Sequence, residues 1–249
     1  MKTQALLSWY ANHARDLPWR RTRDPWAILV SEVMLQQTQA SRVVPYYERF
    51  LQRFPDPSSC ASAAAAEVLR AWSGLGYNRL ALALHRAAAV IAAHGWPQDL
   101  EDLPGVGSYT AAAVASFAFG APGLAVDTNV RRVLARTGLR VGAPTPALNQ
   151  ALMELGATVC TARGPRCAAC PLAEDCDGPE EPAPRGPGRV RFEDTDRFVR
   201  GRVVAALAAG TALPEVDPQR LRRALDGLER DGLIERSGPR VRLPGQTVR

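Results

Sequence analysis

The chain has 249 residues, a mass of 26.9 kDa and 46% hydrophobic residues, which is enough for one large domain or two smaller ones with their own cores. Its longest apolar runs are far shorter than the roughly twenty residues of a membrane helix, and its N-terminus lacks the pattern of a secretory signal, so we expect a cytoplasmic protein without a membrane partner. The formal net charge of +6 suits a polyanionic partner, but a solvated basic surface explains it as well.

Residues 1–176 are predicted to form a succession of helices. Apolar residues recur there with a spacing near 3.6, Ala and Leu are abundant, and Gly or Pro separates the segments. No stretch of this region shows the alternation expected of strands, so the predicted fold class is all-α. Residues 177–190 are dominated by Pro and Gly, cannot form an apolar face and are predicted to be a linker.

A smaller module is predicted over residues 191–249. Its apolar pattern indicates helices over 196–209 and 218–231. The segment LIERSGPRVRL that follows contains two short alternating pieces joined at Ser237 and Gly238, as in a hairpin. The order helix, helix, hairpin favours a winged-helix-like C-terminal module.

Glu32 stands inside the apolar run AILVSEVML, which predicts a buried helical stretch. Burial disfavours the charged form of a carboxyl group, and a carboxyl group that keeps its proton can act as a general acid. The alternative is a Glu on the solvent-facing side of an amphipathic helix. The amides of Gln36, Gln37 and Gln39 follow directly and suit contacts to base edges, although ordinary helix surface explains them too.

The segment LPGVGSYTAAAV places Gly105 and Gly107 in a tight turn that opens onto an Ala-rich helix. Such a turn presents consecutive backbone N–H groups at a helix N-terminus, where a phosphate can be held without reading the base sequence. A plain turn between two helices explains the pattern equally well. About twenty residues later, Asp127 begins another helix, where the simplest role of an Asp is to cap the N-terminus.

Four of the five cysteines lie close together, with the spacing C-x6-C-x2-C-x5-C. Four thiolates brought to one centre suit either an iron–sulfur cluster or structural zinc. Zinc sites usually pair two short C-x2-4-C knuckles, whereas here one C-x2-C pair has longer, unequal arms, so we predict a structural 4Fe-4S cluster over zinc, and disulfides least. The predicted ligands are Cys160, Cys167, Cys170 and Cys176, while Cys60 stands apart.

The arm between the first two of these cysteines, TARGPR, carries Arg163 and Arg166. A loop held by a cluster would project both cations from a rigid base. Contact with phosphates is the natural use of such a pair.

Several motifs, taken together, resemble those of the MutY adenine DNA glycosylases, which share the helix-hairpin-helix superfamily with endonuclease III. The resemblance covers nearly all of residues 6–176, and SEVMLQQTQ together with the cysteine spacing is its most specific part. The motifs are LPWR (17–20), DPWAILVSEVMLQQTQ (24–39), WSGLGY (72–77), LPGVGSYTAAAV (103–114), VDTNVRRVLAR (126–136) and the cysteine array.

This resemblance implies a two-lobed helical fold that carries the 4Fe-4S cluster loop and binds double-stranded DNA as a monomer. Residues 1–176 would form the catalytic region, with a six-helix barrel over about 22–130 and a cluster lobe from 1–21 and 131–176. The implied substrate is DNA that contains a mismatch or an oxidised base. A bacterial protein of this kind would be associated with the nucleoid.

The resemblance also implies catalytic roles. Glu32 matches the acid that protonates adenine N7, and Asp127 matches the carboxylate that stabilises the positively charged sugar or its covalent successor. Two carboxyl groups in opposite protonation states suit the cleavage of an N-glycosidic bond. Tyr109 and Asn129 match positions that orient these groups.

Other residues match positions that contact DNA in the family. Gln37, with Gln36, matches residues wedged into the base stack, and Tyr77 matches the aromatic inserted beside the base opposite the target. Such wedges offset the cost of extruding a nucleotide. The predicted DNA-contacting set is Arg20, Gln36, Gln37, Tyr77, Gly105, Gly107, Arg163 and Arg166.

The lysine content narrows the reaction. A bifunctional glycosylase uses an amine to form a Schiff base with the sugar, and in the endonuclease III branch that Lys stands where this chain has Tyr109. The chain has thirty Arg but a single Lys, Lys2, which lies far from every motif in the sequence. We therefore expect a monofunctional enzyme that uses water and leaves an uncut abasic site.

Two features depart from the family pattern. Residues 137–151 form a shorter connection than is usual, which leaves the preferred mispair open. The C-terminal module is too small for the Nudix-like domain that recognises 8-oxoguanine in MutY proteins, although some short MutY-like chains end in a segment similar to FEDTDRFVRGRVVAAL.

Two alternative functions stay open. A thymine/uracil mismatch glycosylase of the same superfamily would suit Tyr109, but LQQTQ disfavours it. A catalytically inactive iron–sulfur protein that binds DNA would not explain why Glu32, Tyr109 and Asp127 are all present.

Overall fold

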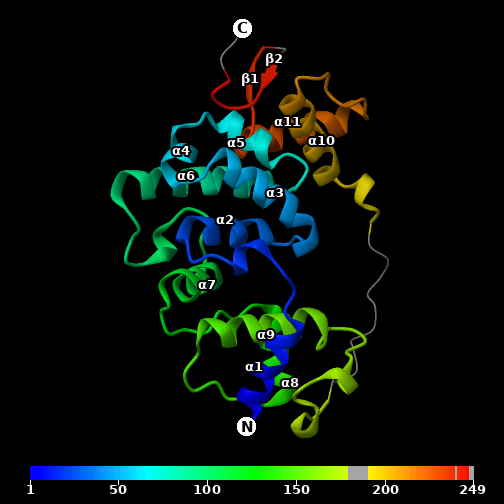
Figure 1. The fold of residues 1–249 in the computed structure, drawn as a ribbon. Coiled ribbons are helices and arrows are strands. Elements are labelled where there is room, and N and C mark those ends of the chain that lie inside the picture. The colour runs from blue at the N-terminus through cyan, green and yellow to red at the C-terminus, as the bar shows by residue number, and fades with distance from the viewer. Residues whose placement is uncertain (179–189, 239, 247–249) are drawn as a thin grey trace. The chain divides into compact units, whose positions relative to one another are not determined.

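The computed structural model describes residues 1–178, 190–238 and 240–246 (Figure 1). The chain forms two compact units, each built from two stretches of sequence. The first unit comprises the described parts of Met1–Leu29 and Val106–Gly186, and the second comprises those of Val30–Gly105 and Pro187–Arg249. These boundaries differ from those of the barrel (about 22–130) and the cluster lobe (1–21 and 131–176) that the resemblance implies. Most of the predicted linker, residues 177–190, lies outside the described residues.

The first unit is helical. Its core lies where α9 packs against α1 and α8. Apolar residues recur along α8 and α9 every three or four positions, as at Val130, Val133, Leu152 and Leu155, and this spacing places them on one helix face. The elements are α1 (Lys2–His13), the 3-10 helix η1 (Pro18–Arg20), the start of α2 (Pro25–Leu35), α7 (Ser108–Phe119), α8 (Thr128–Thr137), α9 (Pro146–Thr158), η3 (Cys167–Ala169) and η4 (Ala173–Asp175).

The second unit takes up α2 from Val30 onward and adds a further set of helices. α6 packs against α4 and α5, and α5 also packs against α3. The rings of Phe50 and Trp72, both buried, meet edge to face with centroids 6.0 Å apart. The elements are α3 (Ala40–Arg53), α4 (Pro57–Ser62), α5 (Ala65–Trp72), α6 (Asn78–His94) and the 3-10 helix η2 (Leu100–Asp102).

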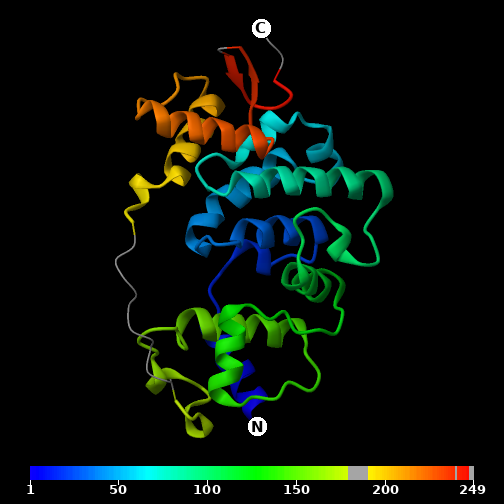
Figure 2. The ribbon, with the colours of Figure 1, turned by 180° about the vertical axis from the view of Figure 1, so that it is seen from behind.

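The C-terminal module belongs to this second unit and has the predicted order of elements. Its helices α10 and α11 lie side by side, and α10 also packs against α5 (Figures 1 and 2). The Ala66 N–H, at the start of α5, donates to the Pro244 carbonyl at 3.1 Å. The elements are η5 (Phe192–Asp194), α10 (Asp196–Ala209), α11 (Pro218–Arg230), β1 (Glu235–Ser237) and β2 (Arg240–Arg242).

The hairpin predicted around Ser237 and Gly238 is confirmed as an antiparallel pair in which Glu235 lies opposite Arg242. Within the described residues, this pair is the only sheet, so the all-α prediction is also confirmed. No helix in the described part of the chain has both the length and the hydrophobicity needed to cross a membrane.

Candidate active site and nucleic-acid interface

Glu32 lies in α2, among neighbours that are buried as well. The helix begins at Pro25, and Asp24 Oδ1 accepts a hydrogen bond from the Trp26 N–H at 3.0 Å, which caps the first turn. Glu32 is 5% exposed, and Ser31 and Val33 on either side are 1% and 2% exposed. The buried position is therefore confirmed and the solvent-facing alternative is wrong. A buried carboxyl group next to a motif of amide side chains is a candidate general acid.

Asp127 is the N-cap residue of α8, and two hydrogen bonds hold its carboxylate. Oδ1 accepts from the Val130 N–H at 2.6 Å, and Oδ2 accepts from Asn129 Nδ2 at 2.8 Å. The capping role is thus confirmed, and Asn129 contacts the carboxylate directly. Glu32 and Asp127 belong to different units, Glu32 to the second and Asp127 to the first.

Hydrogen bonds continue from Asn129 toward the cysteine loop through Arg132. Arg132 Nη2 donates to Asn129 Oδ1 at 2.7 Å and to the Gly156 carbonyl at 2.8 Å, and its Nε donates to the Cys160 carbonyl at 2.8 Å. A Cβ atom at Gly156 would come within 2.8 Å of Asn129 Cβ, so glycine is needed for this close packing of α9 on α8. Sequence reasoning missed Arg132, although its four-residue spacing from Arg136 places both on one face of α8.

The turn before α7 contains both predicted glycines. Gly105 has a φ of 80°, and a Cβ atom there would come within 2.6 Å of Ala83 Cβ, so this position requires glycine. Gly107 is the N-cap of α7 in an extended conformation, and no side chain caps that helix. Tyr109 follows in the first turn of α7, half-buried, with its hydroxyl 3.9 Å from Met153 Sδ.

The predicted wedge residues Gln37 and Tyr77 are in contact in the second unit. The Tyr77 hydroxyl donates to Gln37 Oε1. Gln37 has a φ of 59° and Tyr77 a φ of 49°, and no other described non-glycine residue has a positive φ. This conformation is unfavourable for residues with a Cβ atom, and such strained positions cluster at functional sites. Gln36 lies beside this pair in sequence and is half-buried.

The turn WSGLGY explains how Tyr77 reaches this conformation. Gly74 and Gly76 have φ values of 96° and 90°, which glycine adopts readily. Trp72 Nε1 donates to the Gly76 carbonyl at 2.9 Å and fixes the turn to a buried ring. The chain therefore enters α6 from a closed turn, with Tyr77 at its N-cap.

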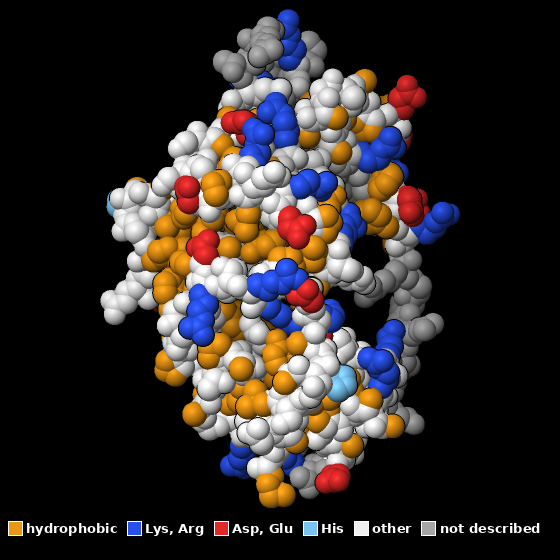
Figure 3. Space-filling model, in the orientation of Figure 1, with side chains coloured by type: hydrophobic (Ala, Val, Ile, Leu, Met, Phe, Trp, Pro, Cys, Tyr) orange, Lys and Arg blue, Asp and Glu red, His pale blue; other side chains and the backbone are white. Residues whose placement is uncertain are grey.

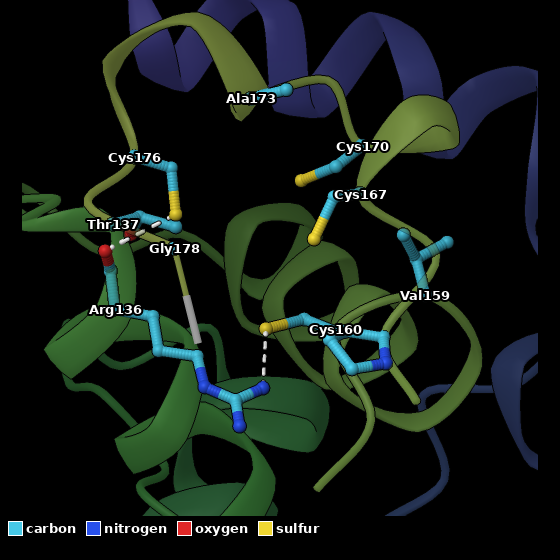
Figure 4. Close-up of a pocket in the computed structure, with 10 residues that line it drawn as sticks. Arg136, Thr137, Val159, Cys160, Cys167, Cys170, Ala173, Cys176 and Gly178 are labelled. Carbon is cyan, nitrogen blue, oxygen red and sulfur yellow. Dashed lines mark hydrogen bonds between the residues drawn. The ribbon is translucent and has the colours of Figure 1, made fainter. Parts of the chain in front are cut away.

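The four clustered cysteines line one pocket, with a cavity volume of about 70 Å³ (Figure 4). Burial raises the pKa of the Cys170 thiol, and the nearby thiols of Cys160, Cys176 and Cys167 raise that pKa further. The predicted convergence of the four thiols is therefore confirmed, and their chemistry fits a centre that binds soft metals. Within the described residues, no three metal-ligating side chains close on a single ion. Cys60 is buried elsewhere, which raises the pKa of its thiol to about 12.

Arg136 lines the same pocket from α8. Its Nη1 lies 3.6 Å from Cys160 Sγ and donates to the Thr161 carbonyl at 2.8 Å, while Cys176 Sγ donates to the Arg136 carbonyl at 3.2 Å (Figure 4). A guanidinium at this place would offset the negative charge of thiolates. Sequence reasoning missed Arg136 as well.

The three predicted DNA-contacting arginines of the first unit differ in their partners. Arg20 donates to Glu154 Oε2 at 2.6 Å, in an ion pair whose Glu side chain is fully buried and which Arg15 completes. Arg166 donates to the Thr158 carbonyl through Nε and Nη2. Arg163 is exposed. The ion pair of Arg20 thus joins η1 to α9 within the first unit.

Comparisons with known proteins point in one direction. The family model described as HhH-GPD superfamily base excision DNA repair protein matches residues 30–157. An adenine DNA glycosylase of Mycolicibacterium smegmatis is 45% identical, over 97% of this chain and 95% of the relative. The chain is a MutY-type DNA glycosylase of the HhH-GPD superfamily. The match spans nearly the whole chain and therefore includes the C-terminal module, which this relative shares.

Other similarities support the same placement. The human adenine DNA glycosylase is 42% identical to this MutY-type chain, over 69% of this chain and 38% of the human protein. The structure of a thermostable thymine-DNA glycosylase matches with a TM-score of 0.64 and 29% identity, over 70% of this chain and 93% of that one. A trapped endonuclease III–DNA covalent intermediate matches with a TM-score of 0.60 and 25% identity, over 70% and 92%. The chain is therefore a DNA N-glycosylase of base excision repair.

Proposed function

We propose that this MutY-type glycosylase removes adenine mispaired with 8-oxoguanine or guanine in double-stranded DNA, acting as a monomer. The observation that carries the proposal is Glu32, buried at 5% exposure within the SEVMLQQTQ motif, in a chain 45% identical to an adenine DNA glycosylase. A buried acid suits adenine, because the adenine N7 atom must gain a proton before the base can leave as a neutral molecule.

The carboxyl groups of Glu32 and Asp127 have different roles in the proposed reaction. Glu32, protonated, donates its proton to N7 of the extruded adenine as the N-glycosidic bond breaks. Asp127, as a carboxylate, offsets the positive charge that develops on the sugar. The hydrogen bonds from Val130 and Asn129 fix the orientation of the Asp127 carboxylate. Tyr109 and Asn129 orient these reacting groups.

Water completes the reaction. The only lysine, Lys2, donates through Nζ to the Thr137 carbonyl at 3.1 Å, on the far end of α8 from Asp127. An internal amine is therefore not positioned to form a Schiff base with the sugar. The product is an abasic site in an uncut strand.

DNA contacts come from several elements. The turn with Gly105 and Gly107 holds a phosphate at the start of α7, and Gln36, Gln37 and Tyr77 enter the base stack. Arg163 and Arg166 contact phosphates from the cysteine loop, and Arg20 adds a cation from η1. Strain at Gln37 and Tyr77 supports a functional role for both, because strained backbone positions cluster at ligand-contacting sites.

We propose that Cys160, Cys167, Cys170 and Cys176 hold a 4Fe-4S cluster, which, when bound, cross-links the loop at four points. Four thiols that line one cavity supply the ligand set of such a cluster, and the long, unequal arms around the C-x2-C pair disfavour zinc. The purified protein is expected to be brown, with broad absorbance at about 400 nm. Cys167→Ser should lower this absorbance and the iron content, and Cys60→Ser should leave both unchanged. Stoichiometric zinc without iron or sulfide after anaerobic preparation would overturn the cluster proposal.

One assay tests the proposed reaction. The purified protein is incubated with duplexes that carry A opposite 8-oxoguanine, A opposite G, T opposite G or U opposite G, and abasic sites are then cleaved with alkali. We expect excision of adenine only, with strand cleavage only after alkali. Excision of T or U would instead favour the thymine/uracil branch, which the thymine-DNA glycosylase structure and Tyr109 keep as the second candidate. No excision from any duplex would favour an inactive DNA-binding protein.

A further inference from the structure

Arg197 of the C-terminal module contacts the wedge residue Tyr77. Its guanidinium carbon lies 3.7 Å from the centroid of the Tyr77 ring and 5.9 Å from that of Phe192. All three residues belong to the second unit, where α10 packs against α5. Gln37, Tyr77 and Arg197 therefore form a continuous row of side chains, which we call the wedge row.

The start of α10 is firmly placed. Thr195 caps the helix by accepting from the Phe198 N–H at 3.3 Å. Arg220 of α11 donates to the carbonyls of Glu193 and Thr195 at 2.8 Å and 3.2 Å. Arg197 thus lies at a helix end that is held by the Thr195 cap and by Arg220. These contacts fix the backbone from which Arg197 reaches the Tyr77 ring.

Arg197 has no ion-pair partner among the described residues, whereas Arg200 pairs with Asp231 and Arg223 with Asp196. Arg197 is exposed, and one face of its guanidinium rests on an aromatic ring while the donor edges remain for a ligand.

The surroundings of Arg197 suit nucleic acid. Phe192 is 54% exposed and meets Phe198 edge to face at 5.6 Å. Basic side chains lie beside hydrophobic and acidic ones over the C-terminal helices on the face shown in Figure 3. Cations interleaved with exposed aromatic rings are typical of surfaces on which bases stack and phosphates bind.

We propose that Arg197 is a specificity-determining residue, which binds the base opposite the target adenine while it supports the Tyr77 ring. The inference rests on the proposed adenine excision. Because the guanidinium covers one face of the ring, Tyr77 has only its other face for a base. The forked donors beside that ring can then reach the O6 carbonyl, an acceptor that guanine and 8-oxoguanine share, whereas cytosine presents an amino donor on the corresponding edge. The C-terminal module thereby couples the identity of the opposite base to excision.

The test compares Arg197→Ala, Arg197→Lys and the matched control Arg202→Ala, whose guanidinium lies over Phe198 on the same helix at 5.8 Å. Single-turnover excision and duplex affinity are measured with A opposite 8-oxoguanine, G and C. We expect the rate ratio of 8-oxoguanine to C duplexes to fall about tenfold in Arg197→Ala, as for the loss of one good base contact. Arg197→Lys should show the same fall, because an ammonium group lacks the planar fork. Arg202→Ala should keep the wild-type ratio.

An unchanged ratio in Arg197→Ala would overturn the inference, as would an equal loss on all three duplexes, which indicates a phosphate contact only. A gain in rate would also overturn it, since Arg197 would then obstruct the wedge. Thermal unfolding and absorbance at about 400 nm verify that each variant folds. If the wild-type protein excises no adenine, the proposed function itself fails, and this outcome is separate from the others.

Discussion

The two carboxyl groups occupy opposite kinds of environment. Glu32 lies in the middle of a helix among buried apolar neighbours, while Asp127 sits at a helix N-terminus and accepts two hydrogen bonds. The first carboxyl group is withdrawn from water, whereas the second meets a backbone donor and an amide donor at the start of a helix. The proposed reaction uses this contrast, because it needs a proton donor at one carboxyl group and a charge stabiliser at the other.

The largest expected effect tests this contrast directly. Glu32→Gln keeps shape but cannot donate the proton, and Asp127→Asn keeps a capping oxygen but lacks the charge. Each should lower single-turnover excision at least about a hundredfold with nearly unchanged affinity for mismatch DNA. Excision and thermal stability are measured on the same preparations.

Matched controls separate catalysis from stability. Glu48→Gln removes an exposed Glu of α3, and Asp217→Asn alters an N-cap of α11 that accepts from the N–H groups of Gln219 and Arg220. Both controls should excise at the wild-type rate, and the cap variants should lose at most about 1 kcal/mol of stability. Near-wild-type excision by Glu32→Gln and Asp127→Asn would remove the basis for the assigned roles.

A smaller loss of excision is expected for variants of Arg132, which contacts Asp127 only through Asn129. Arg132→Ala deletes the donors to Asn129 Oδ1 and to the Gly156 and Cys160 carbonyls, so Asn129, which supplies one of the two hydrogen bonds to Asp127, should be held less firmly. We expect excision to fall about tenfold with duplex affinity retained. Arg132→Lys, which cannot serve three acceptors in a plane, should behave similarly. If both variants excise normally, Asn129 orients Asp127 without help from Arg132.

The smallest effect is expected for the arginines of the cysteine loop, whose removal should alter DNA affinity and leave the excision step unchanged. Arg163→Ala removes an exposed cation from the cysteine loop and should reduce the slope of log affinity against log salt by about 0.9, with the same result on every sequence. Arg166→Ala should do less, because its guanidinium already donates to the Thr158 carbonyl. Arg21→Ala, which deletes a cation paired with Asp16, is the control and should not alter the slope. Equal slopes for all variants would mean that the loop faces away from DNA.

Local sequence determined much of this protein. The period of apolar residues predicted the helices, including α10 over its full length and α11 to within one residue. The spacing of four cysteines predicted their common pocket. Such features follow from residues close together in the chain, where helix geometry and short loops allow few arrangements.

Contacts between distant residues were decided by the tertiary structure. Arg132 reaches Cys160, and Arg197 reaches Tyr77, from elements that no local pattern pairs. The positive φ angles of Gln37 and Tyr77 oppose the intrinsic preference of both residues, so only the surrounding packing can impose them. Burial of Glu32 could be predicted because its neighbours in sequence are mostly apolar, and the cap formed by Asp127 could be predicted because it is local. Whether that carboxylate also serves a reaction could not be predicted locally, because a helix cap has the same sequence in either case.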